Sequence, residues 1–558
     1  MKKKKIGKVC LNYTYYNGKD VYSDGDIEDV LLESCINGTQ EELLKSSREW
    51  EVLYHFSPIR ENVIEWYPIS KEDNVLEIGS GCGAITGTLS KRANHITCIE
   101  LSEKRSLINA NRHKNMDNIE IILGNFQEIE PHLEKYEIIT LIGVWEYSKL
   151  YIDSEKPFED MLKLAQRHLS HNGKLVIAIE NKMGIKYWNG APEDHTSRQY
   201  SGLNDYVDDK ERGVRTFSRQ EIEKILKTTG FNEYCFYYPM PDYKLPTAIY
   251  TDFYQPKICE LRNFRKDYAY SRMYNFNDAI ISDQICSDGM FSYFANSFIV
   301  VCGETDEKMQ FIKYNRERKK EFQIATEIKK NNSHIEVIKR ALYKEGQEHI
   351  KKIKVNSQKW NSTINNIKTL EGTLKQGNYI ESYIQGTDFN NILYEDRHDF
   401  KKFINIINDI VMVYWEETEK PIKFVETEEF AKIFGKYEGK KTDSFLITNI
   451  DMIFSNMKLS AQKDIYTFDN EWVFDFPIPY KYSLWRMLEE IYEKFLPYLR
   501  GKIGREEFIE NFGIDKTEII SYREMEKNFA NYVFGKNQEM KYMRNYEKTV
   551  FMQETKIW

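Results

Sequence analysis

The chain has 558 residues, of which 41% are apolar, 30% are charged and 14% are aromatic, and its formal net charge is −8. This length is too great for one hydrophobic core, so we expect more than one domain. The acidic balance excludes a simple binder of the nucleic-acid backbone, and no apolar run is long enough to span a bilayer. We therefore expect a cytoplasmic protein with at most peripheral contact at the inner face of a membrane and no nucleic-acid partner.

The first half of the sequence alternates strand and helix patterns. Residues 1–44 form an N-terminal extension with a hairpin-like start, and apolar spacings of three and four predict a helix over 41–66. Five apolar runs with helical stretches between them follow, namely NVLEIG, HITCIE, IEIILG, EIITLIGV and GKLVIAIE. This rhythm is typical of βαβ units and a parallel sheet. The proline-dense segment PMPDYKLPTAIYTDFYQP predicts that this domain ends near residue 256.

A glycine turn follows the first of these runs, in VLEIGSGCGAITGTL (75–89). Gly79, Gly81 and Gly83 let the backbone approach a ligand at a helix N-terminus. A dinucleotide site would use GxGxxG, but Ala84 stands at the position of its last glycine. Glu77, two residues before the turn, would repel a pyrophosphate and suits a cationic ligand with an amino-acid head.

Two later strand ends add to this pattern. Glu100 ends HITCIE, where a carboxylate can accept both hydroxyl protons of a ribose, and Asn125 and Phe126 follow IEIILG, where they would bracket an adenine. The ordered set resembles class I S-adenosylmethionine (SAM)-dependent methyltransferases over about residues 45–256. The resemblance implies a Rossmann-like, seven-stranded α/β domain that binds SAM through these residues.

The loop after the fifth strand, ENKMGIKYWNGAPEDHT (180–196), should roof the pocket for the methyl acceptor. We predict that the acceptor is held by Lys182, Lys186, His195 and Arg215. An alcohol or amine acceptor needs a base, for which His195 or Glu146 would serve, whereas a phosphate oxygen needs only cations. The cations favour an anionic acceptor, and ordinary exposed loop charges are the alternative.

Beyond residue 256 the order of elements changes. SFIVVCG and MQFIKY read as a strand pair, a Lys/Glu-rich helix is predicted over 316–330, and IEVIKRAL with HIKKIKV reads as a hairpin. The strand NYIESYI precedes a mostly helical part from 388 to 500. Residues 501–558 form a C-terminal tail with one amphipathic helix around 521–533. These patterns predict a second domain over 257–500.

The segment TNIDMIFSNMKLSAQKDIYTFDNEW (448–472) places Asn456 five residues after Asp451, and Asp469 thirteen residues later. This is the spacing of the catalytic loop and metal-binding Asp of protein-kinase-like enzymes, so residues 257–500 resemble a two-lobed α+β phosphotransferase. The resemblance implies ATP and Mg²⁺, with Asp451 orienting the acceptor hydroxyl and Asn456 and Asp469 binding metal. Glu471 would help to hold a second metal ion.

The strand MQFIKY supplies Lys313 as the phosphate-clamping lysine, with Glu321 or Glu327 of the following helix as its ion-pair partner. No His-Arg precedes Asp451, and Asp469-Asn470-Glu471 replaces the DFG triplet, so a protein substrate is not expected. The alternative is a kinase-like domain without catalytic activity that only binds a ligand or acts as a scaffold.

The pair of domains resembles the bifunctional kinase–methyltransferases that terminate bacterial O-antigen chains. The resemblance implies phosphorylation and then methylation of the terminal sugar of a surface polysaccharide, with a glycan or lipid-linked sugar as acceptor and a glycosyltransferase as partner. No long coiled coil follows the second domain, so a chain-length ruler is not predicted. Two alternatives stay open: a methyltransferase with a non-catalytic kinase-like domain, and a non-enzymatic assembly factor.

Overall fold

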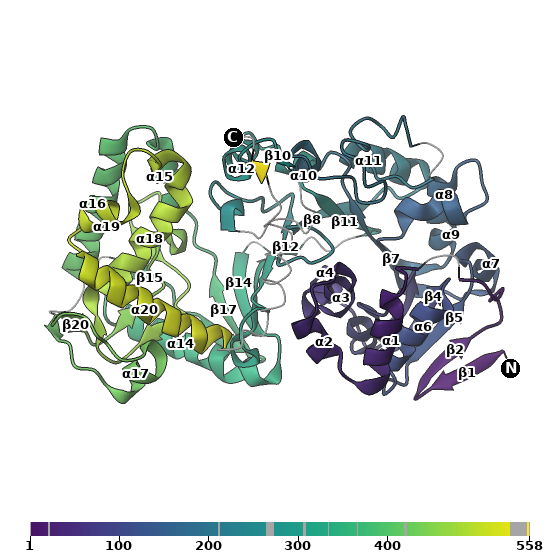
Figure 1. The fold of residues 1–558 in the computed structure, drawn as a ribbon, viewed down its shortest axis with the longest axis horizontal. Coiled ribbons are helices and arrows are strands. Elements are labelled where there is room, and N and C mark those ends of the chain that lie inside the picture. Colours follow the sequence, from purple (N-terminus) through teal and green to yellow (C-terminus); the bar gives the residue numbers. More distant parts are fainter. Residues whose placement is uncertain are drawn as a thin grey trace.

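The computed structural model describes residues 2–20, 23–209, 213–263, 273–304, 308–332, 334–364, 367–417, 421–535 and 555–556. Figure 1 shows strands β12, β14 and β17 between the first half of the chain, purple to blue, and the helical C-terminal part, green to yellow. Among the described residues, no helix combines the length and the apolar character needed to cross a bilayer.

The five predicted strands of the first half are confirmed. They are β3 (Asn74–Ile78), β4 (His95–Glu100), β5 (Ile119–Leu123), β6 (Tyr136–Ile142) and β7 (Leu169–Glu180). They pair in parallel in the order β5-β4-β3-β6-β7. Helices cover both faces, and the main ones are α5 (Thr86–Ser90), α6 (Glu103–Arg112), α9 (Pro157–Arg167) and α11 (Arg219–Thr228). The strands are buried on both faces, as a parallel sheet requires.

One antiparallel strand from beyond the predicted boundary completes this sheet. Strand β11 (Ser297–Cys302) lies between β7 and β8 (Tyr234–Met240) and pairs with both, with Val300 opposite Ile177 and Phe236. All six residues of β11 are buried. The prediction that SFIVVCG opens a second domain is therefore wrong, because this strand closes the seven-stranded sheet of the first half. The first domain thus extends past residue 256 to about 302.

The N-terminal residues belong to the same half. Strands β1 (Lys3–Ile6) and β2 (Val9–Asn12) form the predicted hairpin, and β2 pairs in parallel with β5. The helix predicted over 41–66 is interrupted twice, because Pro58 starts a new turn at η1 and residues 47–49 leave the helix. The helices of this region are α1 (Ile27–Asn37), α2 (Gln40–Ser46), α3 (Trp50–Phe56), η1 (Pro58–Glu61) and α4 (Asn62–Glu65).

The sheet continues without a break into the second half. Strand β9 (Ala248–Thr251) pairs with β8 on one side and β12 (Met309–Tyr314) on the other. Strands β13 (Ile324–Asn331), β14 (His334–Ala341), β17 (Asn378–Ser382) and β16 (Thr373–Lys375) follow in that order, and α14 (Gln347–Asn361) packs on them. The prediction of a helix over 316–330 is wrong, since β13 pairs with both β12 and β14. HIKKIKV likewise lies in α14, not in a hairpin.

The C-terminal part is mostly helical, as predicted. Its helices are α15 (Phe389–Glu395), α16 (Phe400–Glu417), α17 (Glu428–Phe434), α18 (Tyr480–Leu499), α19 (Arg505–Glu510) and α20 (Lys516–Phe534). A short hairpin of β22 (Met457–Leu459) and β23 (Ile465–Thr467) stands beside them. The predicted tail helix is α20, which buries Tyr522, Met525 and Phe529 in the same core as α18. Residues 501–535 are therefore part of this body.

The remaining described elements are short. They are η2 (Glu130–His132), η3 (Trp145–Tyr147), η5 (Leu261–Asn263), η6 (Lys320–Phe322), η7 (Lys344–Gly346), η8 (Phe454–Asn456), α7 (Phe126–Ile129), α8 (Ser148–Tyr151), α10 (Ile185–Trp188), α12 (Asp278–Ser287), α13 (Phe291–Phe294), β10 (Met273–Tyr274), β15 (Ile367–Thr369), β18 (Thr387–Asp388), β19 (Ile422–Lys423), β20 (Asp443–Phe445), β21 (Thr448–Asn449), β24 (Val473–Phe474), β25 (Ile478–Pro479) and β26 (Thr555–Lys556).

Candidate active sites

The first cavity lies at the carboxyl ends of β3, β4, β6 and β7 and has a volume of about 360 Å³. In an open α/β sheet, ligands bind at this edge, so the position agrees with the motif analysis. The predicted residues on its wall are Glu77, Gly79, Gly81, Glu100, Lys186 and His195. We refer to this space as the first cavity.

The glycine turn needs its glycines for two different reasons. Gly79, Gly81 and Gly83 all have positive φ, at 73°, 52° and 75°. A Cβ on Gly79 would lie 2.4 Å from Val144, and one on Gly83 would lie 2.3 Å from Asn109. A Cβ on Gly81 would meet nothing within 4 Å. Gly81 therefore borders open space, as expected where a ligand approaches the backbone.

Glu100 is fixed at the end of β4 by the turn itself. One carboxylate oxygen accepts the Gly81 N–H at 2.7 Å, and the other accepts the Ser102 N–H at 3.0 Å. Burial raises the pKa of Glu100, while these N–H groups oppose that rise. Glu77 accepts the Thr86 hydroxyl at 2.6 Å, and burial raises its pKa to about 7. The two acids thus border the cavity at defined positions.

Asn125 and Phe126 do not join this set. Neither residue is on the wall of the first cavity. The Asn125 side chain caps α7 by accepting the Gln127 N–H at 2.9 Å, and it donates to the Tyr151 carbonyl at 2.9 Å. Phe126 is 6% exposed and lies in the apolar core. In this structure both residues support the chain, so the predicted adenine contact is not brought to the cavity.

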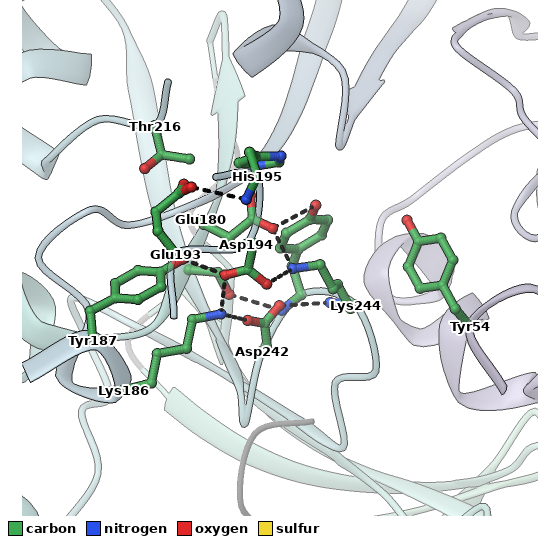
Figure 2. Close-up of polar contacts among 12 residues, drawn as sticks. Tyr54, Glu180, Lys186, Tyr187, Glu193, Asp194, His195, Thr216, Asp242 and Lys244 are labelled. Carbon is green, nitrogen blue, oxygen red and sulfur yellow. Dashed lines mark hydrogen bonds and ion pairs between the residues drawn. The ribbon is translucent and has the colours of Figure 1, made fainter. Parts of the chain in front are cut away.

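The sequence analysis missed the wall that the N-terminal region builds. Trp50 and Tyr54 of α3 and Arg60 of η1 face the cavity. Arg60 donates to the Tyr54 hydroxyl at 3.0 Å and to the Tyr243 carbonyl at 2.9 Å. Figure 2 shows Tyr54 across the gap from the polar network around Lys244. The periodicity of 41–66 indicated only a core-facing side, so nothing in the pattern distinguished these residues.

The predicted acceptor cations are already paired. Lys186 lies 2.9 Å from Asp194 and 2.9 Å from Asp242, and it is 3% exposed (Figure 2). Lys182 and Arg215 do not line the cavity, because both pair with Glu221, at 2.8 Å and 3.3 Å. Of the four residues predicted to hold the acceptor, Lys186 and His195 therefore line this cavity, and Lys182 and Arg215 do not.

Carboxylates instead outnumber lysines at the acceptor end. Lys244, which the sequence did not single out, contacts Glu180 and lies 2.7 Å from Asp194. Two lysines thus lie among four buried or half-buried acids, which are Glu146, Glu180, Asp194 and Asp242. Burial, reinforced by the charge of Glu180, raises the pKa of Glu146. The chemistry of this end is that of an acid-rich chamber.

A second cavity of about 490 Å³ lies between the strands β12–β14 and the helical part. Asn456 and Asp469 are on its wall. They stand just before and just after the β22–β23 hairpin, and the Phe468 N–H donates to the Asn456 carbonyl at 3.0 Å. Asp451 is not on the wall, but its carbonyl accepts the Asn456 amide at 2.9 Å, and burial raises its pKa to about 7. Asn456 and Asp469 therefore share the cavity, whereas Asp451 adjoins Asn456 through its main chain and its carboxylate lies 3.3 Å from Arg486.

The lysine beside these residues is not the predicted one. Lys339 of β14 is 3% exposed and forms an ion pair with Asp469. Lys313 borders the same cavity from β12, but its side chain is exposed. Neither predicted partner contacts it, since Glu321 pairs with Lys319 and Glu327 with Arg340. Because 324–331 is a strand and not a helix, Lys339 of β14, and not Lys313 of β12, lies beside Asp469.

Glu471 also differs from the prediction. It is 3% exposed, pairs with Arg318, and lies 2.6 Å from Nε2 of His349 on α14. Burial opposes ionisation of Glu471, but Arg318 and His349 lower its pKa overall. One oxygen of its carboxylate is therefore taken by Arg318 and His349, and Glu471 does not line the second cavity.

Comparisons with known proteins agree with the methyltransferase resemblance predicted for the first half of the chain. Residues 52–235 match the family described as "Methyltransferase domain". A ribosomal RNA small subunit methyltransferase A of Ligilactobacillus salivarius is 36% identical over 147 residues, covering 22% of this chain and 50% of that protein. A probable ribosomal RNA small subunit methyltransferase A of Methanothermobacter thermautotrophicus is 25% identical over 185 residues, covering 31% and 60%. The chain thus spans about half the length of the curated relatives it matches.

Solved structures were also matched. A SAM-dependent methyltransferase of Thermotoga maritima is 16% identical, with 48% of this chain and 98% of that chain covered and a TM-score of 0.27. That score is too low to support an argument. The sheet order and the glycine turn of the first half agree with this family match, which makes residues 52–235 similar to a methyltransferase domain.

Proposed function

We propose that the protein transfers a methyl group from SAM to an acceptor bound in the first cavity. The observation that carries this proposal is the open approach at Gly81, whose N–H is held by Glu100 at the end of the neighbouring strand. The backbone and the Glu100 carboxylate fit an amino-acid head and a ribose on adjacent strand ends. Glu77 and the acid-rich surroundings suit a sulfonium cation.

In the transfer, a lone pair on the acceptor forms a bond to the methyl carbon while the carbon–sulfur bond breaks. The electron pair of that bond stays on sulfur, so the sulfonium becomes a neutral thioether. The enzyme gains mainly by positioning the two reactants in line. An acceptor hydroxyl must also lose its proton, and His195 and Glu146 border the cavity and would serve as the base when no metal ion occupies this end.

The charges at the acceptor end of the first cavity indicate which kind of acceptor can bind there. Four acids against two paired lysines disfavour a free phosphate or a ribosomal RNA, although RNA is named for the relatives. A hydroxyl-bearing acceptor such as a sugar of a glycan or a lipid-linked sugar fits better. We therefore keep the glycan acceptor as part of the proposal, with oxygen as the methylated atom.

The first test is binding of SAM by isothermal titration calorimetry, followed by transfer of a labelled methyl group to glycan extracts. Binding with transfer to the glycan fraction is expected. Transfer to RNA with none to glycan would overturn the acceptor, and failure to bind SAM would overturn the methyltransferase.

We propose phosphotransfer from ATP as a second activity, located in the second cavity. The specific observation in its favour is the Lys339–Asp469 ion pair beside Asn456, at the two ends of one hairpin. A lysine on phosphate with an Asp and an Asn on metal is the arrangement that ATP–Mg²⁺ requires. Asp451 would receive the proton of the acceptor hydroxyl as the new oxygen–phosphorus bond forms and ADP leaves.

The two activities would act on one acceptor if the product of the second cavity were methylated in the first. Transfer of label from γ-labelled ATP and from methyl-labelled SAM tests this coupling in the wild type and in Asp451→Ala. Loss of both labels in the variant is expected for a bifunctional modifier of a terminal sugar. Methyl transfer that persists without ATP supports the alternative, a methyltransferase joined to a non-catalytic binding domain.

A further inference from the structure

Three buried polar atoms in the first cavity make no hydrogen bond within the described residues. They are Oε2 of Glu146, Oε2 of Glu180 and Nε2 of His195. Glu146 is 1% exposed, Glu180 is fully buried, and the His195 side chain is 8% exposed. Unpartnered polar atoms at such depth are uncommon in proteins, because each one loses its hydration without compensation.

The three residues come from separate elements and converge on one point. Glu146 lies in η3 after β6, Glu180 is the last residue of β7, and His195 belongs to the loop after α10. One ligand atom from each lies within 4.8 Å of the others. His195 Nε2 and Glu180 Oε2 approach to 3.5 Å (Figure 2). This is the spacing of atoms around a shared ion.

The surrounding charges leave room for a cation. The other oxygen of Glu180 contacts Lys244, and Lys244 is shared with Asp194. Lys186 is likewise shared between Asp194 and Asp242. Among the described residues, no basic side chain forms an ion pair or a side-chain hydrogen bond with Glu146, so this end of the cavity has more carboxylates than its two lysines can pair with. A divalent ion would supply the missing charge.

His195 has a support that suits a metal ligand. Its Nδ1 lies 3.1 Å from the Tyr147 hydroxyl. When Nδ1–H donates to the Tyr147 oxygen, the lone pair of Nε2 points toward the two carboxylates. A hydrogen bond of this kind on the far ring nitrogen commonly fixes a metal-bound imidazole.

We propose that Glu146, Glu180 and His195 bind a divalent cation that holds an oxygen of the methyl acceptor. Two carboxylates and one imidazole suit Mn²⁺ and similar first-row ions and leave coordination positions open toward the cavity. The acceptor class is a molecule with a hydroxyl or a neighbouring pair of oxygens. The ion lowers the pKa of the bound hydroxyl, whose proton passes to solvent before the oxygen takes the methyl group.

The proposal rests on the proposed methyl transfer for its role, but the site itself can be tested alone. The probe is Mn²⁺, whose free form is measured by electron paramagnetic resonance in titrations of the full chain without SAM. Asp469→Asn is used as the background throughout, because the second cavity would also bind Mn²⁺. Glu146→Gln and His195→Gln are compared in that background, and Glu130→Gln, a buried acid paired with His168 outside the cavity, is the matched control.

We expect Mn²⁺ binding in the background protein, a loss of at least about tenfold in both ligand variants, and no change in the control. Tyr147→Phe keeps the ring and should weaken binding by a smaller factor, which makes the test independent of whether Glu146→Gln folds. Absence of Mn²⁺ binding in the background protein, or equal binding in all variants, overturns the site.

Calorimetry with SAM on the same proteins separates the two proposals. SAM binding without Mn²⁺ binding would overturn the metal site and leave the methyltransferase standing. Mn²⁺ binding without SAM binding would support the site and overturn the methyltransferase.

Discussion

The two cavities differ in how their acids are balanced. In the second half of the chain, Asp469 on the wall of the second cavity pairs with Lys339, and Glu471, which is not on that wall, pairs with Arg318. In the first cavity, Glu146 has no such partner in the described structure, and Glu180 keeps one oxygen without a hydrogen bond. Where each carboxylate is already paired with a basic side chain, we expect a bound phosphate to compete for the lysine. Where carboxylates lack such a partner, we expect a cation or a cationic reactant to bind.

The largest expected effect concerns the open space at the glycine turn. Gly81→Arg would fill the approach to the first cavity and weaken SAM binding by about 1,000-fold, or ~4 kcal/mol, measured by calorimetry. Gly38→Arg is the matched control, because Gly38 also has positive φ and open space but lies at the end of α1. Similar losses in both variants would show that backbone strain, not the cavity, is responsible.

The second prediction compares two of the lysines that line the second cavity, Lys339 and Lys313. Lys339→Met removes the partner of Asp469 and should reduce phosphate transfer by about 100-fold. Lys313→Met removes an exposed side chain from the same wall and should change it by less than about threefold. Label transfer from γ-labelled ATP measures both, and the reverse order would restore Lys313 as the phosphate-binding residue.

The third prediction tests whether β11 folds with the first or the second half of the chain. Val300→Ala leaves a cavity between β7 and β8 and should lower the free energy of unfolding by about 2–3 kcal/mol. Hydrogen exchange should speed up in β7 and β8 and not in α18. Val355→Ala, at an exposed position of α14, is the control and should have little effect. Faster exchange confined to α18 and its neighbours would assign β11 to the second half.

The fourth prediction concerns the support beneath the glycine turn. His113 Nε2–H donates to the Gly83 carbonyl at 2.9 Å, and burial lowers the pKa of His113 to about 3. The unfolded chain therefore takes up a proton below about pH 6.5 that the folded chain resists. Stability should fall with decreasing pH by up to about 1.4 kcal/mol per unit between pH 6 and 4.

His113→Gln keeps the donor without the titration and should flatten this part of the pH profile, as followed by urea unfolding. His171→Gln, at an exposed position of β7, should leave the slope unchanged. An unchanged slope in His113→Gln would contradict the prediction.

The first cavity could be predicted from the sequence where the chemistry is local. The glycine turn and Glu100 each follow a strand whose apolar run is easy to read, and parallel strands bring their ends to one edge. The partners of Lys182 and Arg215 were not predictable, because Glu221 meets them only through folding of a long loop. The wall formed by Tyr54 was missed because the helical periodicity of 41–66 shows which side faces a core but not which residues border a cavity.

The second half shows how one local error propagates. The segment IATEIKKN has apolar residues at spacings that fit either a helix or a strand, so its sequence did not decide between them. Reading it as a helix placed the first helix of the second half one hairpin too early. The lysine beside the predicted metal-binding Asp was therefore taken to be Lys313, whereas the structure has Lys339 there. The spacing of Asp451, Asn456 and Asp469 was unaffected, because those residues flank a short hairpin whose length is visible in the sequence.

The position of β11 has a consequence for the order in which the protein is made. The parallel strands are complete when residue 180 has been translated, but the strand between β7 and β8 is not synthesised until residues 297–302. The growing chain therefore carries two unpaired strand edges while more than a hundred residues leave the ribosome. Such edges attract other strands. We therefore expect the first half to be prone to mispairing if translation of the segment between β7 and β11 is delayed.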